Sequence, residues 1–142
     1  LAGDEVTFET PGWDKKFDET KQKYPDGIFC MSMYCGRGQS RLNENVTPVV
    51  TKQWRQALGY FWGPMFWHWN VDQWSGDLAK AIDRFEYRSD ITVRIKKIKK
   101  DPTGLRNRSA GIFNRDEWTY KRCKEIYFPG DVEKLRRALK QS

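Results

Sequence analysis

The segment from Gly59 to Trp74 constrains this chain more than any other, because it gathers large aromatic rings and few aliphatic side chains. Its sixteen residues include four of the seven tryptophans and the only histidine. Large aromatic rings bury much area and pack with defined geometry. An aromatic wall with a few polar groups set into it is typical of a pocket for a planar or ring-shaped ligand. An aromatic corner of the core has the same composition, so the segment alone fits both.

A chain of 142 residues is long enough for one domain with its own hydrophobic core. The mean hydropathy of -0.85 and the 32% content of charged residues indicate a soluble protein. No apolar run approaches the roughly 20 residues of a membrane span. The first residues lack the pattern of a signal peptide. The chain also lacks an initiator Met, which leaves room for residues upstream of Leu1.

The three cysteines, Cys30, Cys35 and Cys123, form neither a CxxC pair nor a Cys/His cluster with zinc spacing. Their odd number favours reduced thiols and a cytoplasmic location. The sequence therefore predicts neither a disulfide framework nor a structural zinc site.

The net charge of +7 suggests an anionic partner, such as nucleic acid, a nucleotide diphosphate or an acidic glycan. The bases concentrate between Arg94 and Arg108, where seven of them accompany a single acid, Asp101. Lysines that protect an exposed strand edge give the same pattern. Phosphate binding and edge protection therefore both fit this segment.

Hydrophobic spacing and turn residues predict a mixed α/β order along the chain. Short apolar or alternating runs predict strands at 6–8, 28–34 and 90–96. Three- and four-residue apolar spacing predicts helices at 13–24, 52–58, 71–85 and 118–126, the second of them capped by Thr51 and ended by Gly59. A last helix is expected to begin at residues 129–131, with Asp131 as its N-cap.

Several motifs occur in the order found in one enzyme family. The first is an acid pair at a strand end followed by a turn, Gly3-Asp4-Glu5-Val6-x-Phe8-x-Thr10-Pro11-Gly12-Trp13-Asp14. The others are Pro48-Val49-Val50-Thr51-Lys52-Gln53-Trp54, then Leu58-Gly59-Tyr60-Phe61, then Phe66-Trp67-His68-Trp69-Asn70-Val71-Asp72-Gln73-Trp74, and last Arg115-Asp116-Glu117-Trp118-Thr119-Tyr120. Together they resemble the motifs of family 2-type inverting glycosyltransferases with the GT-A fold, above all the phage- and bacteria-borne branch.

The resemblance implies an α/β fold with a partial GT-A-like (nucleotide-diphospho-sugar transferase-like) mixed sheet and flanking helices. It implies one glycosyltransferase-like domain over residues 1–142 that lacks the N-terminal nucleotide-binding half, because the likeness begins at the acid motif. An upstream half or a partner chain would then complete the domain. The implied source is bacterial or viral, and the implied location is the cytoplasm of a bacterium or of a phage-infected host cell.

The chemistry implied by the resemblance needs a metal ion and a base. Asp4, with Glu5 second, would bind Mg²⁺ or Mn²⁺, which neutralises the charge of the leaving diphosphate. Asp72 would deprotonate the acceptor hydroxyl. An acidic turn that solvates a strand end also accounts for Asp4 and Glu5, and a helix cap also accounts for Asp72.

The resemblance also implies residues that bind the acceptor sugar and the phosphates. The acceptor candidates are Trp67, His68, Trp69 and Trp74, although each can equally be a packing residue, and we expect at least one of the three tryptophans to lie in the core. The candidates for binding phosphate are Arg37, Arg41, Arg94 and Lys96, because arginine binds phosphate as a bidentate donor. Arginines in a surface loop need no such role.

One departure from the family pattern affects the metal site. Relatives commonly carry a histidine after the strand at 90–96, whereas this chain has Arg94-Ile95-Lys96-Lys97 there. Either a base replaces the metal charge at the diphosphate, or metal-dependent catalysis has been lost. The implied function is sugar transfer from a nucleotide-sugar donor to a glycan or a modified base, by a metal-dependent inverting enzyme if it is active. The alternative is a non-catalytic, basic nucleic-acid-binding or virion-associated protein.

Overall fold

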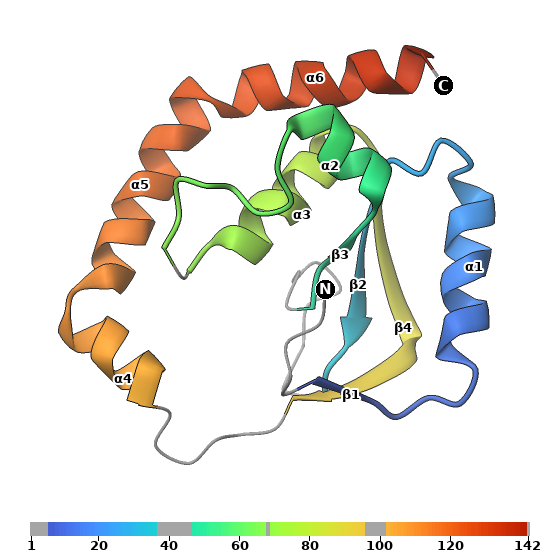
Figure 1. Ribbon diagram of the computed structural model, residues 1–142, viewed down its shortest axis with the longest axis horizontal. Coiled ribbons are helices and arrows are strands. Elements are labelled where there is room, and N and C mark those ends of the chain that lie inside the picture. Colours follow the sequence, from blue (N-terminus) through green and yellow to red (C-terminus); the bar gives the residue numbers. More distant parts are fainter. Residues whose placement is uncertain (1–5, 37–46, 68, 96–101, 142) are drawn as a thin grey trace.

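A curled four-stranded mixed sheet with helices packed against it organises the chain (Figure 1). The computed structural model describes residues 6–36, 47–67, 69–95 and 102–141. The strands are β1 (Val6–Phe8), β2 (Cys30–Tyr34), β3 (Val49–Val50) and β4 (Phe85–Ile95), in the order β1-β4-β2-β3. The mixed α/β class predicted from the sequence is therefore confirmed.

Strand β4 is long because it pairs with two different strands, one after the other along its length. Its first residues pair in parallel with β2, and its last residues pair antiparallel with β1, with Val93 opposite Phe8. Between these regions the register with β2 shifts: Met33 lies opposite Arg88, but Tyr34 lies opposite Thr92. Irregular pairing of this kind bends a strand, and Figure 1 shows β4 turning toward β1 at its lower end.

Strand β2 is buried on both faces, as a central strand requires. Side chains alternate along an extended chain, and the run from Ile28 to Met33 divides accordingly between two hydrophobic clusters. Ile28 and Cys30 belong to one cluster. Phe29, Met31 and Met33 belong to the other. The predicted buried strand is thus confirmed, and it joins both halves of the core.

Helix α1 (Trp13–Lys23) covers one face of the sheet. Phe17 packs beside Phe29, with ring centroids 6.2 Å apart. The guanidinium of Arg88 reaches from β4 to the helix, where it donates to the backbone oxygen of Lys16 at 2.9 Å. This face therefore combines an apolar layer with polar bonds at its rim.

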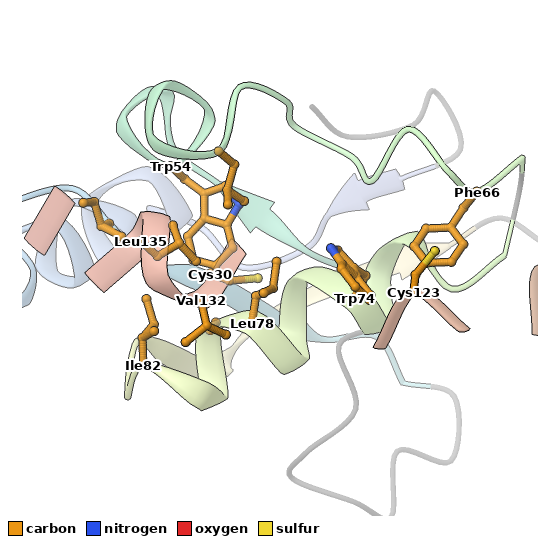
Figure 2. Packing of buried hydrophobic residues seen from close by; sticks show 12 residues of the cluster. Cys30, Trp54, Phe66, Trp74, Leu78, Ile82, Cys123, Val132 and Leu135 are labelled. Carbon is orange, nitrogen blue, oxygen red and sulfur yellow. The ribbon is translucent and has the colours of Figure 1, made fainter. Parts of the chain in front are cut away.

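Helices α2 (Lys52–Leu58), α3 (Val71–Ala81) and α6 (Phe128–Gln141) supply the larger cluster. Figure 2 shows Trp54 and Leu78 packed with Val132 and Cys30, and Trp74 lying beside Phe66. The last helices of the chain thereby close the core over the strands that precede them.

Helices α4 (Pro102–Ser109) and α5 (Ile112–Ile126) form an arm along the left side of Figure 1 that leads up to α6. Helix α5 begins six residues before the predicted start at Trp118. Its described buried residues are Asp116 and Cys123. More than half of its residues are exposed.

The predicted boundaries between α3 and β4 and at the start of α6 are also wrong. Helix α3 ends at Ala81 and Phe85 begins β4, because Asp83 takes a left-handed φ of 55° and Arg84 N–H donates back to Ala79 O at 2.8 Å. Such a helix end is usually marked by glycine, which is absent here.

Helix α6 begins at Phe128, so Asp131 is not its N-cap. Asp131 already lies within the turn, since its N–H donates to Tyr127 O at 3.0 Å. Pro129 is tolerated in the first turn because the backbone N–H that it lacks has no partner there. None of the described helices is both long and apolar enough to cross a membrane.

Candidate functional site

The aromatic segment folds as a loop between α2 and α3, described at residues 59–67 and 69–70. We call it the aromatic loop. Gly59 starts it with a left-handed φ of 89°, as glycine does after a helix. Asn70 ends it with a φ of 66°, a conformation in which asparagine is enriched. Inside the loop, a Cβ on Gly63 would lie 2.7 Å from the sulfur of Met65, so a side chain here would require the Met65 side chain to move.

Asp116, on α5, fixes the end of the aromatic loop. Its side chain is 0% exposed. The Trp67 N–H donates to Oδ1 at 3.2 Å, and the Trp69 N–H donates to Oδ2 at 2.8 Å. Hydrogen bonds to a carboxylate are stronger than those between neutral groups. One buried acid therefore holds the loop across the N-terminal part of α5.

The three candidate tryptophans of this region lie in three different environments. Trp67 is 63% exposed, and the guanidinium carbon of Arg115 lies 3.7 Å from its ring centroid. Trp69 is partly buried and meets Phe113 edge to face, with centroids 5.6 Å apart. Trp74 is 1% exposed and packs in the core. The expectation that at least one is a core residue is confirmed by Trp74, whose ring has no free face for a sugar.

Trp74 belongs to a polar and aromatic cluster beneath the aromatic loop. Its ring meets Phe128 edge to face, with centroids 5.4 Å apart. Its indole N–H donates to the hydroxyl of Tyr60 at 3.2 Å, and that hydroxyl donates to Asp131. Burial, followed by the hydrogen bond to Asp131, raises the pKa of Tyr60. These contacts keep Trp74 and the start of the loop in place.

Asp72 lies in the first turn of α3, directly after the aromatic loop. It is partly buried, and Oδ1 accepts the backbone N–H of Gln73 at 2.8 Å. Burial raises the pKa of Asp72, while the backbone hydrogen bond acts in the opposite direction. A carboxyl with a raised pKa at the foot of an aromatic loop suits a general base better than a solvated surface acid does.

Several predicted site residues lie outside the described part of the chain. They are Asp4, Glu5, Arg37, Arg41, His68 and Lys96. The remaining candidate for binding phosphate, Arg94, lies in the described part of the chain. It is exposed at the end of β4 and forms an ion pair with Glu9. Within the described ranges, no group of three or more His, Cys, Asp or Glu side chains is arranged to bind a metal ion.

Sequence reasoning did not single out Arg115, Asp116 and Trp118 as functional residues. Trp118 is 69% exposed, the most exposed large hydrophobic side chain described. Helical spacing alone could have placed Asp116 on the face of Tyr120 and Cys123, and an acid on a buried face needs a partner. The same spacing turns Trp118, two residues after Asp116, to the opposite side of the helix, but only the packing of α5 shows that this side faces solvent.

Comparison with known proteins gives no assignment: no protein-family model, no curated protein and no solved structure matches this chain.

Proposed function

We propose that this chain is a glycosyltransferase-like domain that transfers a sugar from a nucleotide-sugar donor to a hydroxyl acceptor. The proposal starts from the ordered motifs that resemble GT-A-fold, family 2-type inverting glycosyltransferases. A mixed sheet with flanking helices is compatible with a partial GT-A-like fold. The acceptor is a glycan or a modified base.

The observation that carries the proposal is the position of Asp72. The first turn of α3 presents its carboxyl directly after an aromatic loop whose end is bonded to Asp116. Burial raises the pKa of this carboxyl, and a catalytic base works best when its pKa approaches the working pH. Trp67 and Trp69, on the same loop, are described rings that can stack on an acceptor sugar.

In the proposed reaction, the acceptor hydroxyl oxygen forms a bond to the anomeric carbon of the donor sugar. The bond from that carbon to the diphosphate oxygen breaks, and the diphosphate leaves with the electron pair. Asp72 takes the proton of the acceptor hydroxyl. Arg94, which is exposed and paired with Glu9, is the described candidate for binding the leaving phosphate.

The carboxylates of Asp4 and Glu5 are hard oxygen donors, which suit Mg²⁺ or Mn²⁺. Such an ion would neutralise charge on the diphosphate.

The test compares Asp72→Asn with a matched variant, Asp14→Asn. Both acids lie in the first turn of a helix, but Asp14 lies on α1 at the other side of the molecule (Figure 1). Release of nucleoside diphosphate is measured with a panel of nucleotide sugars, acceptors and Mn²⁺. Asp72→Asn should reduce turnover at least about 100-fold, the usual worth of a general base, while Asp14→Asn leaves it unchanged.

Unfolding serves as the control for Asp72→Asn. A raised folded-state pKa means that the protonated carboxyl favours the fold, and this contribution is lost as pH rises through the folded-state pKa. The neutral amide should therefore leave stability at pH 7 unchanged or slightly higher. Full turnover by a folded Asp72→Asn variant, or no response of the wild type to any donor, would refute the proposal.

A further inference from the structure

The exposed side of α5 carries a row of alternating aromatic and basic side chains. The row, which we call the α5 ridge, consists of Trp67, Arg115, Trp118, Lys121 and Arg122. Residues 115, 118, 121 and 122 are three or four positions apart, so they are neighbours on one face of the helix. Trp67 joins from the aromatic loop, where the Arg115 guanidinium lies 3.7 Å from its ring centroid.

The rings of the α5 ridge face solvent. Trp67 is 63% exposed and Trp118 is 69% exposed. Burying a tryptophan ring stabilises a fold strongly, and the core here has already taken up Trp54 and Trp74. Both rings border Arg115, Trp67 through the guanidinium contact and Trp118 through helical spacing, so they mark a binding face rather than scattered surface residues.

Most of the cations near these rings form no ion pair with a described acid. Arg115 and Lys121 form no ion pair with a described carboxylate, and neither do Arg106 and Arg108 on α4; the described pairs of the arm are Arg122 with Glu125 and Lys124 with Asp77. Asp116 is buried and accepts hydrogen bonds from the aromatic loop. Glu117 and Glu125 are the other acids of α5, and the six basic residues of α4 and α5 outnumber them, so the arm carries a net positive charge.

We propose that the α5 ridge binds single-stranded nucleic acid, with bases stacked on Trp67 and Trp118 and phosphates bound by Lys121, Arg122 and the arginines of α4. Unpaired bases offer flat rings at every nucleotide, and the backbone offers an anion at each step, which matches alternating rings and cations. A neutral glycan would stack on the rings but leave the cations without a partner. A lipid surface would require a continuous apolar face, whereas cations interrupt this one.

The experiment measures fluorescence anisotropy of a labelled oligothymidylate of about 20 nucleotides, longer than a typical binding site, over a series of KCl concentrations. Trp118→Ala removes a stacking ring, so its Kd should rise about tenfold with the same salt dependence. Lys121→Ala removes a phosphate contact, so the slope of log K against log[KCl] should fall by about 0.7. A duplex of the same length should bind more weakly, because its bases are already stacked on one another.

Matched controls separate the ridge from general charge and aromatic content. Tyr127→Ala removes an exposed ring from the same arm, outside the ridge. Lys15→Ala removes an exposed lysine from α1, which lies away from α5 in Figure 1. Both variants should keep the wild-type Kd within about twofold, because neither residue belongs to the proposed binding face, and a distant surface cation is screened by salt.

Three results would overturn the proposal. The first is absence of binding to the single strand at low salt. The second is equal loss of affinity in the controls and in the ridge variants. The third is binding of heparin or of anionic phospholipid vesicles with the same dependence on Trp118 and without preference for the single strand. Trp118 has no part in the proposed sugar transfer. The turnover of Asp72→Asn and the binding of oligothymidylate by the Trp118 variant therefore test the two proposals separately.

Discussion

Asp116 shows how one side chain can determine the shape of a whole segment. It is fully buried, and its two carboxylate oxygens accept the N–H groups of Trp67 and Trp69. A buried carboxylate is costly unless it is hydrogen-bonded, so the loop and the acid depend on each other. The exposed position of Trp67 and the contact between Trp69 and Phe113 follow from this anchor.

Replacing Asp116 with Ala should lower the free energy of unfolding by about 2–4 kcal/mol, because two charge-assisted hydrogen bonds are lost and donors remain without a partner. Asp116→Asn keeps one acceptor oxygen and should lose less. Urea unfolding measures both variants, and amide hydrogen exchange at Trp67 and Trp69 should accelerate. Glu133→Ala, which breaks only the exposed pair with Arg137, should change stability by less than about 1 kcal/mol. An unchanged exchange rate in Asp116→Ala would show that other contacts hold the loop.

The tryptophans also show the limit of residue-level reasoning. Trp67, Trp69 and Trp74 fall within eight residues of one another, and their side chains are chemically identical. Trp74 is buried because it lies on the inner face of α3, where spacing of three and four residues places apolar side chains. Trp67 and Trp69 lie in a loop without periodicity, so only their contacts with α5 decide which ring is exposed.

At the scale of elements, local signals work best where a cap is present. Helix α2 begins where the sequence predicts, because the Thr51 hydroxyl accepts the Trp54 N–H at 3.1 Å, and it ends at Gly59 with a left-handed backbone. The Thr51 hydroxyl also donates to the Gly27 carbonyl oxygen. The cap thus joins α2 to the turn before β2.

Replacing Thr51 with Ala should lower the free energy of unfolding by about 1–2 kcal/mol, the usual cost of losing an N-cap. Thr51→Ser keeps the hydroxyl and should stay within about 0.5 kcal/mol of the wild type. Chemical denaturation followed by tryptophan fluorescence measures both, since Trp54 lies in the core beside the cap. If the two variants were equally unstable, the lost methyl group rather than the hydrogen bonds would be responsible.

At the scale of the molecule, a set of charges joins α1 to the sheet. Arg88 on β4 forms ion pairs with Asp90 at 2.8 Å and with Glu19 at 2.7 Å. Lys16 forms an ion pair with Asp90 at 2.7 Å. The hydrogen bonds from Arg88, with help from Lys16, lower the pKa of Asp90 well below its usual range. The set lies at the edge of the apolar layer that contains Phe17.

This pKa direction predicts how stability depends on pH. Since the folded-state pKa of Asp90 is lowered, the ionised carboxylate stabilises the fold above the unfolded-state pKa of about 4. That contribution is lost as pH falls through the folded-state pKa. Asp90→Asn should therefore be less stable than the wild type at pH 7, and the difference should shrink as the pH is lowered below about 4.

Urea unfolding at several pH values checks this prediction, with Asp18→Asn as the control. Asp18 pairs with Lys21 at 3.5 Å on the exposed side of α1, and such pairs contribute little. The free energy of unfolding of Asp18→Asn should differ little from that of the wild type at every pH. A difference for Asp90→Asn that stays constant down to pH 2 would show that the packing of Asp90, not its charge, stabilises the fold.

The sequence by itself determined the elements whose signals are local. Helix α2, the central strand β2 and the inward face of α3 follow from caps, apolar runs and periodicity, which act within a few residues. The aromatic composition of the loop and the presence of Asp72 after it were also apparent from the sequence. No glycine or cap residue marked the end of α3 at Ala81 or the start of α6 at Phe128. The length of β4 was also missed, because pairing with the distant strands β1 and β2 decided it.

Only the tertiary structure decided which rings face solvent and what they lie beside. Asp116 and Trp67 are separated by 49 positions, and no periodicity links an acid on one helix to the backbone of a distant loop. The same packing places Arg115 over Trp67 and leaves Trp118 exposed. Composition thus left open an aromatic pocket wall or an aromatic corner of the core, while the folding of α5 against the aromatic loop placed Trp67 in a basic and aromatic ridge.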